Sequence, residues 1–230
     1  MGKVTRVNVD ALEQNMNYSI IRTGPSRGFA GDHPLLIKAA EKADALVVLG
    51  ERAKGALSAI PDHAEKIVVL VELGAECLGA ITGESRGLEG SNVLGFARFR
   101  LGDGEPSNLV ELVRQPKTSQ SAIDAAKDIF TAAGLQVAIC NDFAGRIIDR
   151  LVRPYYNAAL RRLDEGLASA DDMDTTLKLG LGYPEGPITL LERTGLHHHF
   201  DVSQALFEAY GESAYAPARR ARVAKQRQGK

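Results

Sequence analysis

Three consecutive histidines, His197, His198 and His199, are the residues whose types most directly suggest chemistry in this chain. Imidazole nitrogens are common zinc ligands, and a structural zinc site needs four ligands around one ion. Consecutive residues at the start of a helix point in different directions, so at most two of these rings can reach the same ion. We therefore predict an ordinary, partly exposed helix start and no metal site.

A glycine-rich stretch at residues 24–31, with the sequence GPSRGFAG, is the second candidate. It lies between a strand-like and a helix-like segment, where backbone amides can bind a phosphate. Its spacing differs from the GxGxxG pattern of dinucleotide-binding folds, and no acidic residue at a following strand end clearly marks a ribose site. An ordinary turn is therefore the better interpretation. The chain also has no GxSxG, HExxH or Walker pattern that would indicate a hydrolase or an NTPase.

Composition and charge place the chain among ordinary globular proteins of one large or two modest domains. It has 230 residues, of which 44% are hydrophobic, and 28 basic residues balance 29 acidic ones. A net charge of -1 creates no field that would attract nucleic acid or an anionic membrane surface. No apolar stretch is long enough to span a bilayer, and Cys77 and Cys140 lack ligand spacing. We expect a cytoplasmic protein with buried free thiols and no nucleic-acid or membrane partner.

Short β-branched runs alternate with amphipathic stretches in the first 140 residues. Alternation of strands with helices predicts an α/β layer built on a parallel sheet. Proline at position 34 opens one predicted helix, and Gly134 closes another. The predicted strands are 19–23, 45–49, 66–73, 93–99 and 136–140, and the two helices are 34–42 and 119–133.

The strand signal stops after Cys140, and the rest of the chain is predicted to be helical. Residues 145–163 carry a long apolar stripe that contains Pro154, and Ser169 can cap the next helix. The last residues are rich in arginine and have few large apolar side chains, so we expect them to fray. The predicted domains are residues 1–140, a helical domain at 141–215, and a basic tail at 216–230.

Several stretches resemble the 3-hydroxyacyl-CoA dehydrogenase family in order and spacing. The most specific is DTTLKLGLGYPEGPITLLERTG at 174–195, which is close to the family's helix, GxPxGP turn and following helix. The resemblance implies a Rossmann-type domain that binds NAD and a helical domain that dimerises. It also implies a His–Glu pair that oxidises the 3-hydroxyl group of an acyl-CoA. The other matching stretches are 108–120, 142–155, and 157–160 with 165–168, and the resemblance covers roughly residues 43–215.

The family's catalytic histidine has no counterpart in this chain. Its position falls on Ala97 in the stretch GFARFR, and alanine can neither accept a proton nor polarise a carbonyl group. Neither Arg98 nor Arg100 can replace it, because a guanidinium stays protonated. The carboxylate that orients the histidine matches Glu111, although residues 102–106 lengthen the connection before it. The alternative interpretation of Glu111 is an acid at the surface end of a strand.

Two positions that are neutral in the family are acidic here. The asparagine that holds the substrate matches Asp149, and a serine matches Glu76. Two carboxylates would repel the negative charge that develops on a thioester carbonyl, which argues against the family's oxidation. The alternative is that both acids form salt bridges in a filled cleft, for example with Arg98 or Arg146. Guanidinium groups also suit phosphates, so Arg98, Arg100 and Arg146 are the candidates for holding the CoA portion of a ligand.

The expected fold is a degenerate Rossmann-like parallel sheet layer followed by an all-helical C-terminal domain. The expected function is that of a 3-hydroxyacyl-CoA dehydrogenase family protein of acyl-CoA metabolism. It is catalytically impaired, and it acts in acyl-CoA binding or as the partner subunit of a catalytic chain. The alternative is an active NAD-dependent 3-hydroxyacyl-CoA dehydrogenase with rebuilt catalytic residues. We expect an acyl-CoA-like ligand, a homodimer formed through the helical half, and no cofactor, or NAD if the alternative holds.

Overall fold

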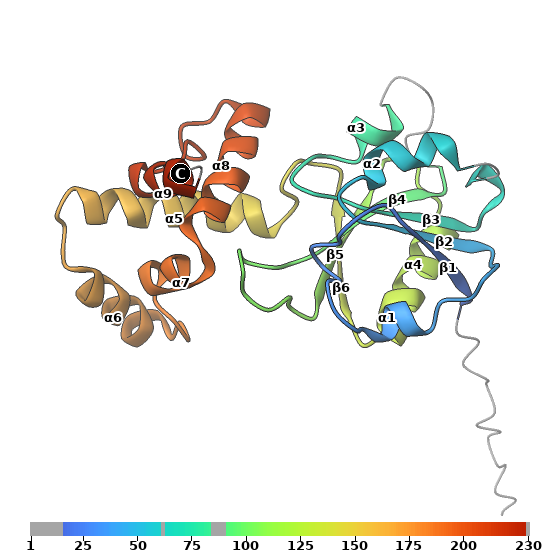
Figure 1. The fold of residues 1–230 in the computed structure, drawn as a ribbon, viewed down its shortest axis with the longest axis horizontal. Coiled ribbons are helices and arrows are strands. Elements are labelled where there is room, and N and C mark those ends of the chain that lie inside the picture. Colours follow the sequence, from blue (N-terminus) through green and yellow to red (C-terminus); the bar gives the residue numbers. More distant parts are fainter. Residues whose placement is uncertain (1–15, 61–62, 84–90, 229–230) are drawn as a thin grey trace, which may run out of the picture.

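The computed structural model describes residues 16–60, 63–83 and 91–228, which form an α/β unit and a helical unit side by side (Figure 1). Residues 1–15, with which the predicted first domain begins, lie outside them. The α/β unit contains one six-stranded sheet in the order β1-β2-β3-β4-β5-β6. Its strands are β1 (Tyr18–Arg22), β2 (Ala45–Leu49), β3 (Val68–Glu72), β4 (Val93–Arg98), β5 (Leu109–Arg114) and β6 (Gln136–Asn141).

The sheet is parallel except between β4 and β5, which pair antiparallel. Only residues 99–108 connect these two strands, whereas a parallel pair needs a crossover of about a dozen residues or more, usually with a helix. The helix α4 (Gln120–Ala132) supplies such a crossover between β5 and β6, which are parallel. The predicted α/β class is confirmed, and the sheet is mixed because one connection is short.

Helices cover both faces of the sheet, which explains why β2 and β3 are buried along their whole length. Alternate strand residues point to opposite faces. Val47 and Leu70 pack with α1 (Pro34–Ile37) and α4, whereas Val48 and Val71 pack towards α2 (Ala53–Ala56) and α3 (Gly79–Thr82). Figure 1 shows these two helical layers on either side of the strands. Two short 3-10 turns, η1 (Leu57–Ala59) and η2 (His63–Glu65), complete this unit.

Five helices form the second unit, beyond the end of β6. Its core contains Leu160, Leu191 and Ala221, which come from α5, α7 and α9. Ser169 caps α6 by accepting a hydrogen bond from the backbone N–H of Asp172, as predicted. The helices are α5 (Ile148–Asp164), α6 (Ala170–Leu181), α7 (Pro187–Thr194), α8 (Leu196–Tyr210) and α9 (Arg219–Gln228). None of the helices in the described parts of the chain combines the length and hydropathy needed to cross a bilayer.

Two predicted elements differ from the structure. The helix predicted at 34–42 is the four-residue α1, because the backbone N–H of Ala40 donates to the carbonyl of Tyr18 and the chain leaves helical geometry. The prediction that the basic tail frays was wrong: α9 packs against α8 and α5, and Ala221 is fully buried. The prediction was based on the scarcity of large apolar side chains in this segment. Alanine side chains are small enough to let α9 pack closely against its neighbours.

Candidate functional site

A cavity of about 210 Å³ lies where the α/β unit meets the helical unit, and we call it the junction cavity. The ends of β3 and β4, the strand β5, the first two turns of α5 and the second turn of α8 contribute to its wall. Six of the positions singled out from the sequence lie around it: Ala97, Arg98, Arg100, Glu111, Arg146 and Asp149. Glu76 does not line it, and lies instead in a neighbouring, more open hollow of about 510 Å³ beside Gly50 and Glu51.

Ala97 and Glu111 are direct partners across the antiparallel pair β4–β5. Directly opposed side chains on one face of a sheet lie close together, so a histidine at position 97 would lie beside this carboxylate. The geometry implied by the family resemblance is therefore retained at these two positions. Residue 97 itself is alanine, whose side chain cannot accept a proton.

The carboxylate of Glu111 accepts hydrogen bonds from residues at the start of α5. It accepts hydrogen bonds from Arg146 Nε at 3.2 Å and from the backbone N–H groups of Ile147 at 2.9 Å and Ile148 at 2.8 Å. Its exposed fraction is 2%, so the interpretation of Glu111 as a surface acid was wrong. A carboxylate at the N-terminus of a helix satisfies amides that have no partner within the helix. Glu111 therefore joins the sheet to the helical unit.

Of the two additional acids, Asp149 forms a buried salt bridge, but its partner is neither of the arginines given as examples. Asp149 pairs with Arg153 at 2.8 Å, one helical turn away, and Arg146 is occupied by Glu111. Glu76 accepts a hydrogen bond from the backbone N–H of Gly74 and forms no salt bridge within the described residues. The spacing of four residues on α5 brings Asp149 and Arg153 onto one helix face. Asp149 therefore pairs with Arg153 and not with Arg98 or Arg146.

A buried polar network behind the junction cavity was missed by the sequence argument. Arg153 Nη1 donates to His199 Nδ1 at 3.1 Å, since a guanidinium has no acceptor, and His199 Nε2 then donates to Asn157 Oδ1 at 3.0 Å. Burial, and next the charge of Arg153, lowers the pKa of His199 to about 3. The signal was present in the sequence, because Asp149, Arg153 and Asn157 recur every four residues inside an apolar stripe.

Two arginines at the mouth of the cavity bond only to backbone carbonyl groups. Arg98 donates to Ser107 at 2.6 Å and to Gly28 at 3.1 Å, and Arg100 donates to Gly104 at 2.7 Å. Neither forms a salt bridge with any carboxylate in the described residues. Burial lowers the pKa of Arg98. The charge of Glu105 acts in the opposite direction on the pKa of Arg98, although no salt bridge forms between them. Guanidinium groups that form no salt bridge can bind the oxygens of an anion.

Two further arginines extend this basic character. Arg27 donates to the carbonyl of Arg100 at 3.3 Å and also lines the cavity, so Arg27, Arg98 and Arg100 are called the rim arginines. Inside the cavity wall, Arg146 has a left-handed backbone with φ of 52°, which is strained for a residue other than glycine. Its Nη1 atom is buried and has no hydrogen-bond partner. An unsatisfied buried donor beside a cavity favours a ligand with acceptor oxygens.

Glu72, at the end of β3, holds the glycine-rich stretch at 24–31 in place through hydrogen bonds. Glu72 accepts hydrogen bonds from Gly50 N at 2.7 Å, Ser26 Oγ at 2.8 Å and Gly28 N at 3.2 Å. The backbone amide of Gly28, within this stretch, is thus already paired with a carboxylate and not free for a phosphate. Glu72 was not singled out from the sequence, where it is an acid after a run of buried valines.

The order of the strands in the sheet also argues against a dinucleotide-binding site. Doubly wound sheets bind dinucleotides in the crevice where the strand order reverses. The six described strands follow one another in sequence order, so the described residues contain no such reversal. The residues present therefore do not fit the dinucleotide site that the Rossmann resemblance implies.

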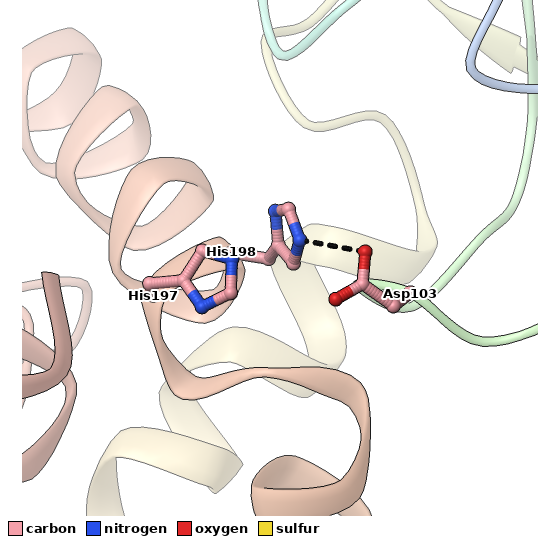
Figure 2. A group of neighbouring side chains, drawn as sticks. All are labelled: Asp103, His197 and His198. Carbon is pink, nitrogen blue, oxygen red and sulfur yellow. Dashed lines mark hydrogen bonds and ion pairs between the residues drawn. The ribbon is translucent and has the colours of Figure 1, made fainter. Parts of the chain in front are cut away.

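The three histidines separate as expected from their spacing. His199 points into the buried network, whereas His197 and His198 lie next to each other at the surface with ring centroids 3.8 Å apart. Asp103, from the connection between β4 and β5, faces His198 (Figure 2). The sequence argument considered the histidines alone and missed this acid, which is 94 positions away from His197.

A sheet layered with helices is joined at a cavity to a helical unit. Residues 145–230 match the family described as 3-hydroxyacyl-CoA dehydrogenase, C-terminal domain. The resemblance to the 3-hydroxyacyl-CoA dehydrogenase family is confirmed, and it is strongest in this helical half.

Known relatives agree with that assignment. The mitochondrial hydroxyacyl-coenzyme A dehydrogenase of Sus scrofa is 38% identical over 109 residues, which are 44% of this chain and 35% of the relative. The 3-hydroxybutyryl-CoA dehydrogenase of Bradyrhizobium diazoefficiens is 35% identical, over 47% of this chain and 37% of the relative. The chain thus spans little more than a third of the length of these relatives.

Solved structures support the fold. The 3-hydroxybutyryl-CoA dehydrogenase of Escherichia coli is 25% identical with a TM-score of 0.65, and covers 79% of this chain and 39% of its own. The (S)-3-hydroxybutyryl-CoA dehydrogenase of Ralstonia eutropha is 22% identical with a TM-score of 0.65, and covers 79% of this chain and 64% of its own.

Proposed function

We propose that this protein takes part in acyl-CoA metabolism by binding an acyl-CoA-type ligand at the junction cavity, without transferring a hydride itself. One observation carries this proposal. Ala97 stands where the family resemblance places the base, and its partner Glu111 is engaged in holding Arg146 and the start of α5. The position is retained, and the chemistry that needed it is absent.

No other group at the cavity is suited to accept the hydroxyl proton. His199 has both ring nitrogens hydrogen-bonded and lies behind Arg153, and Asp149 is paired with Arg153. Two more carboxylates line the cavity: Glu72 accepts three hydrogen bonds, and Asp201 forms an ion pair with Lys225. The other charged groups that line it are arginines, which stay protonated. General-base catalysis typically contributes about 10²–10⁴-fold to the rate, so its loss argues against useful turnover.

The ligand class follows from the charge around the cavity. The rim arginines form no salt bridge within the described residues, and Arg146 Nη1 is unsatisfied there. The volume of about 210 Å³ is below the roughly 300–1,000 Å³ of common ligand pockets, so the cavity suits an acyl head and not a whole CoA. The phosphates of CoA would then lie over the rim arginines, where guanidinium forks match their oxygens.

Titration calorimetry with acetoacetyl-CoA and with free CoA tests this function. We expect a dissociation constant in the micromolar range or weaker for acetoacetyl-CoA. Arg100→Gln should weaken binding about tenfold, since a hydrogen bond to a charged group is worth about 1.5–3 kcal/mol. Arg220→Gln is the matched control, because Arg220 lies far away on α9 and pairs with Asp164.

An assay of NAD reduction with 3-hydroxybutyryl-CoA separates the two functional readings. We expect no NADH above background from the purified chain. Steady NADH production that persists through further purification and is lost in Glu111→Gln would instead favour the active NAD-dependent dehydrogenase. Absence of heat with both acetoacetyl-CoA and CoA would contradict the proposed binding function.

We also propose that the chain forms a homodimer through its helical unit. Large apolar side chains are exposed there on α5, α6 and the turn that follows α6, and such surfaces commonly mark interfaces. They are Leu151, Leu179, Leu181 and Tyr183. A catalytic partner chain that uses the same surface would be the second way to cover it.

Light scattering tests the dimer. We expect about twice the chain mass of 24.7 kDa for the wild type, and a monomer for Leu179→Glu with Leu181→Glu. Ile37→Glu is the control, because Ile37 is an equally exposed apolar residue on the α/β unit. A monomeric wild type at micromolar concentration would contradict this prediction.

A further inference from the structure

Three potential metal ligands meet at the surface between the two units, away from the buried network. One ligand atom each from Asp103, His197 and His198 lies within 4.8 Å of the other two. His198 Nε2 and Asp103 Oδ1 are 2.9 Å apart, and the two imidazole rings are 3.8 Å apart between centroids. Figure 2 shows the carboxylate facing the ring of His198, with the ring of His197 beside it.

The two neighbouring rings converge because of Gly195, which precedes α8. Its φ of 92° lies in the region that favours glycine. A Cβ atom built on Gly195 would lie 2.8 Å from His197 Cε1 and 3.1 Å from His198 Cδ2. Both rings therefore fold over a space that only glycine leaves open. This explains how consecutive residues, which normally diverge, come to one side.

The position of Asp103 is equally determined by backbone contacts. Its N–H donates to the carbonyl of Thr194 at 2.9 Å, at the end of α7. Gly102, with φ of 53°, approaches the same carbonyl so closely that a Cβ atom would lie 1.7 Å from it. The connection between β4 and β5 is thus docked onto the helical unit, and Asp103 is directed at the histidines by that docking.

We propose that His197, His198 and Asp103 bind a divalent transition-metal ion of the zinc class, linking the α/β unit to the helical unit. Two imidazoles and one carboxylate are a common protein ligand set for Zn²⁺, with water in the remaining position. The three side chains are partly or largely exposed, which leaves room for that water. On binding, His198 and Asp103 exchange their mutual hydrogen bond for bonds to the ion.

A simple ion pair between His198 and Asp103 explains less of this geometry. A protonated His198 would face the second imidazole at 3.8 Å, and no described protein group hydrogen-bonds either ring nitrogen of His197. A metal ion gives both rings a partner at once. It also fixes the turn whose Gly104 carbonyl holds Arg100, so the site would order one rim arginine of the junction cavity.

The experiment is a titration of untagged, chelator-treated protein with Zn²⁺, followed by calorimetry and thermal unfolding, with Co²⁺ absorption spectroscopy as a second readout. We expect one ion per chain with micromolar or tighter affinity. At a hundredfold excess over the dissociation constant, the Tm should rise by roughly 5–10 °C. Co²⁺ should give the visible bands of a four- or five-coordinate site.

Three variants test the ligand set. His197→Gln, His198→Gln and Asp103→Asn should each weaken Zn²⁺ binding by more than roughly 100-fold, since loss of an outer-shell partner alone often costs about 10–100-fold. His63→Gln is the control, because His63 lies in the α/β unit and bonds to the carbonyl of Ile60. Circular dichroism at neutral pH checks that each variant is folded.

Failure to bind Zn²⁺ at about 100 μM would overturn the proposal, since a three-ligand site should bind far more tightly. Unchanged affinity in Asp103→Asn would also overturn it, because the ion would then be held by surface histidines alone. Loss of binding in His63→Gln would place the ion elsewhere. No CoA compound is present in these titrations, so their outcome is independent of the proposed acyl-CoA function.

Discussion

Lowering the pH from 6.5 towards 3 should destabilise the helical unit by about 3–5 kcal/mol through His199 alone. Burial, followed by the charge of Arg153, lowers the pKa of His199 from 6.5 to about 3. The unfolded chain therefore takes up a proton in this range, while the folded chain does not. Above pH 6.5, His199 is neutral in both states, and protonation of this residue does not reduce the free energy of unfolding. As the pH falls from 6.5 to about 3, the free energy of unfolding decreases. Each unit of difference is worth about 1.4 kcal/mol.

Urea denaturation at pH 7 and pH 4.5 measures about 3 kcal/mol of this effect, because two of the pH units between the two pKa values lie in that interval. Carboxylates also lose stability in acid, so the decisive quantity is the difference between wild type and His199→Gln. Glutamine cannot take up the proton, and the variant should be less stable at pH 7 but should lose less stability on acidification. His63→Gln, in which a more accessible histidine is removed, should keep the wild-type pH dependence. Equal pH dependence in wild type and His199→Gln would contradict the prediction.

Glu111→Gln should cost about 3–5 kcal/mol in the free energy of unfolding, which is typical of breaking a buried ion pair. Glu111 and Arg146 have side-chain exposures of 2% and 5%. The glutamine carbonyl can still accept from the amides at the start of α5, but its NH₂ group would then face the Nε–H of Arg146. Arg146 would be left as a buried cation without a counter-charge.

Chemical denaturation of a set of variants tests that explanation. Glu111→Gln combined with Arg146→Met should recover part of the loss, because no buried cation remains unpaired. The exposed pair Glu185–Arg193 supplies the matched control, and Glu185→Gln should cost under about 1 kcal/mol. A cost for Glu111→Gln as small as that of Glu185→Gln would show that the carboxylate does not anchor α5.

Most elements of this protein could be predicted from local sequence patterns. The run 45–49 is a strand with the predicted ends, and Ser169 caps the helix predicted to follow it. The helix predicted at 119–133 is observed as α4, with Ser119 as its N-cap. These features depend on residues that are neighbours along the chain, so periodicity and capping chemistry are sufficient to find them. The match of Ala97 to the family's histidine position also depends on a local motif, and it stays a prediction.

Only the tertiary structure determined which residues that lie far apart in the sequence contact each other. The sequence contains the acid Glu111 and the arginine Arg146, but only folding places this arginine on that acid and leaves Asp149 to Arg153. Asp103 meets His198 because a short antiparallel connection docks against the end of α7. Such pairings depend on the topology of the sheet and on competition among several charged groups. No periodicity in the sequence encodes that competition, so residue types alone determined the candidates, and the fold determined which of them meet.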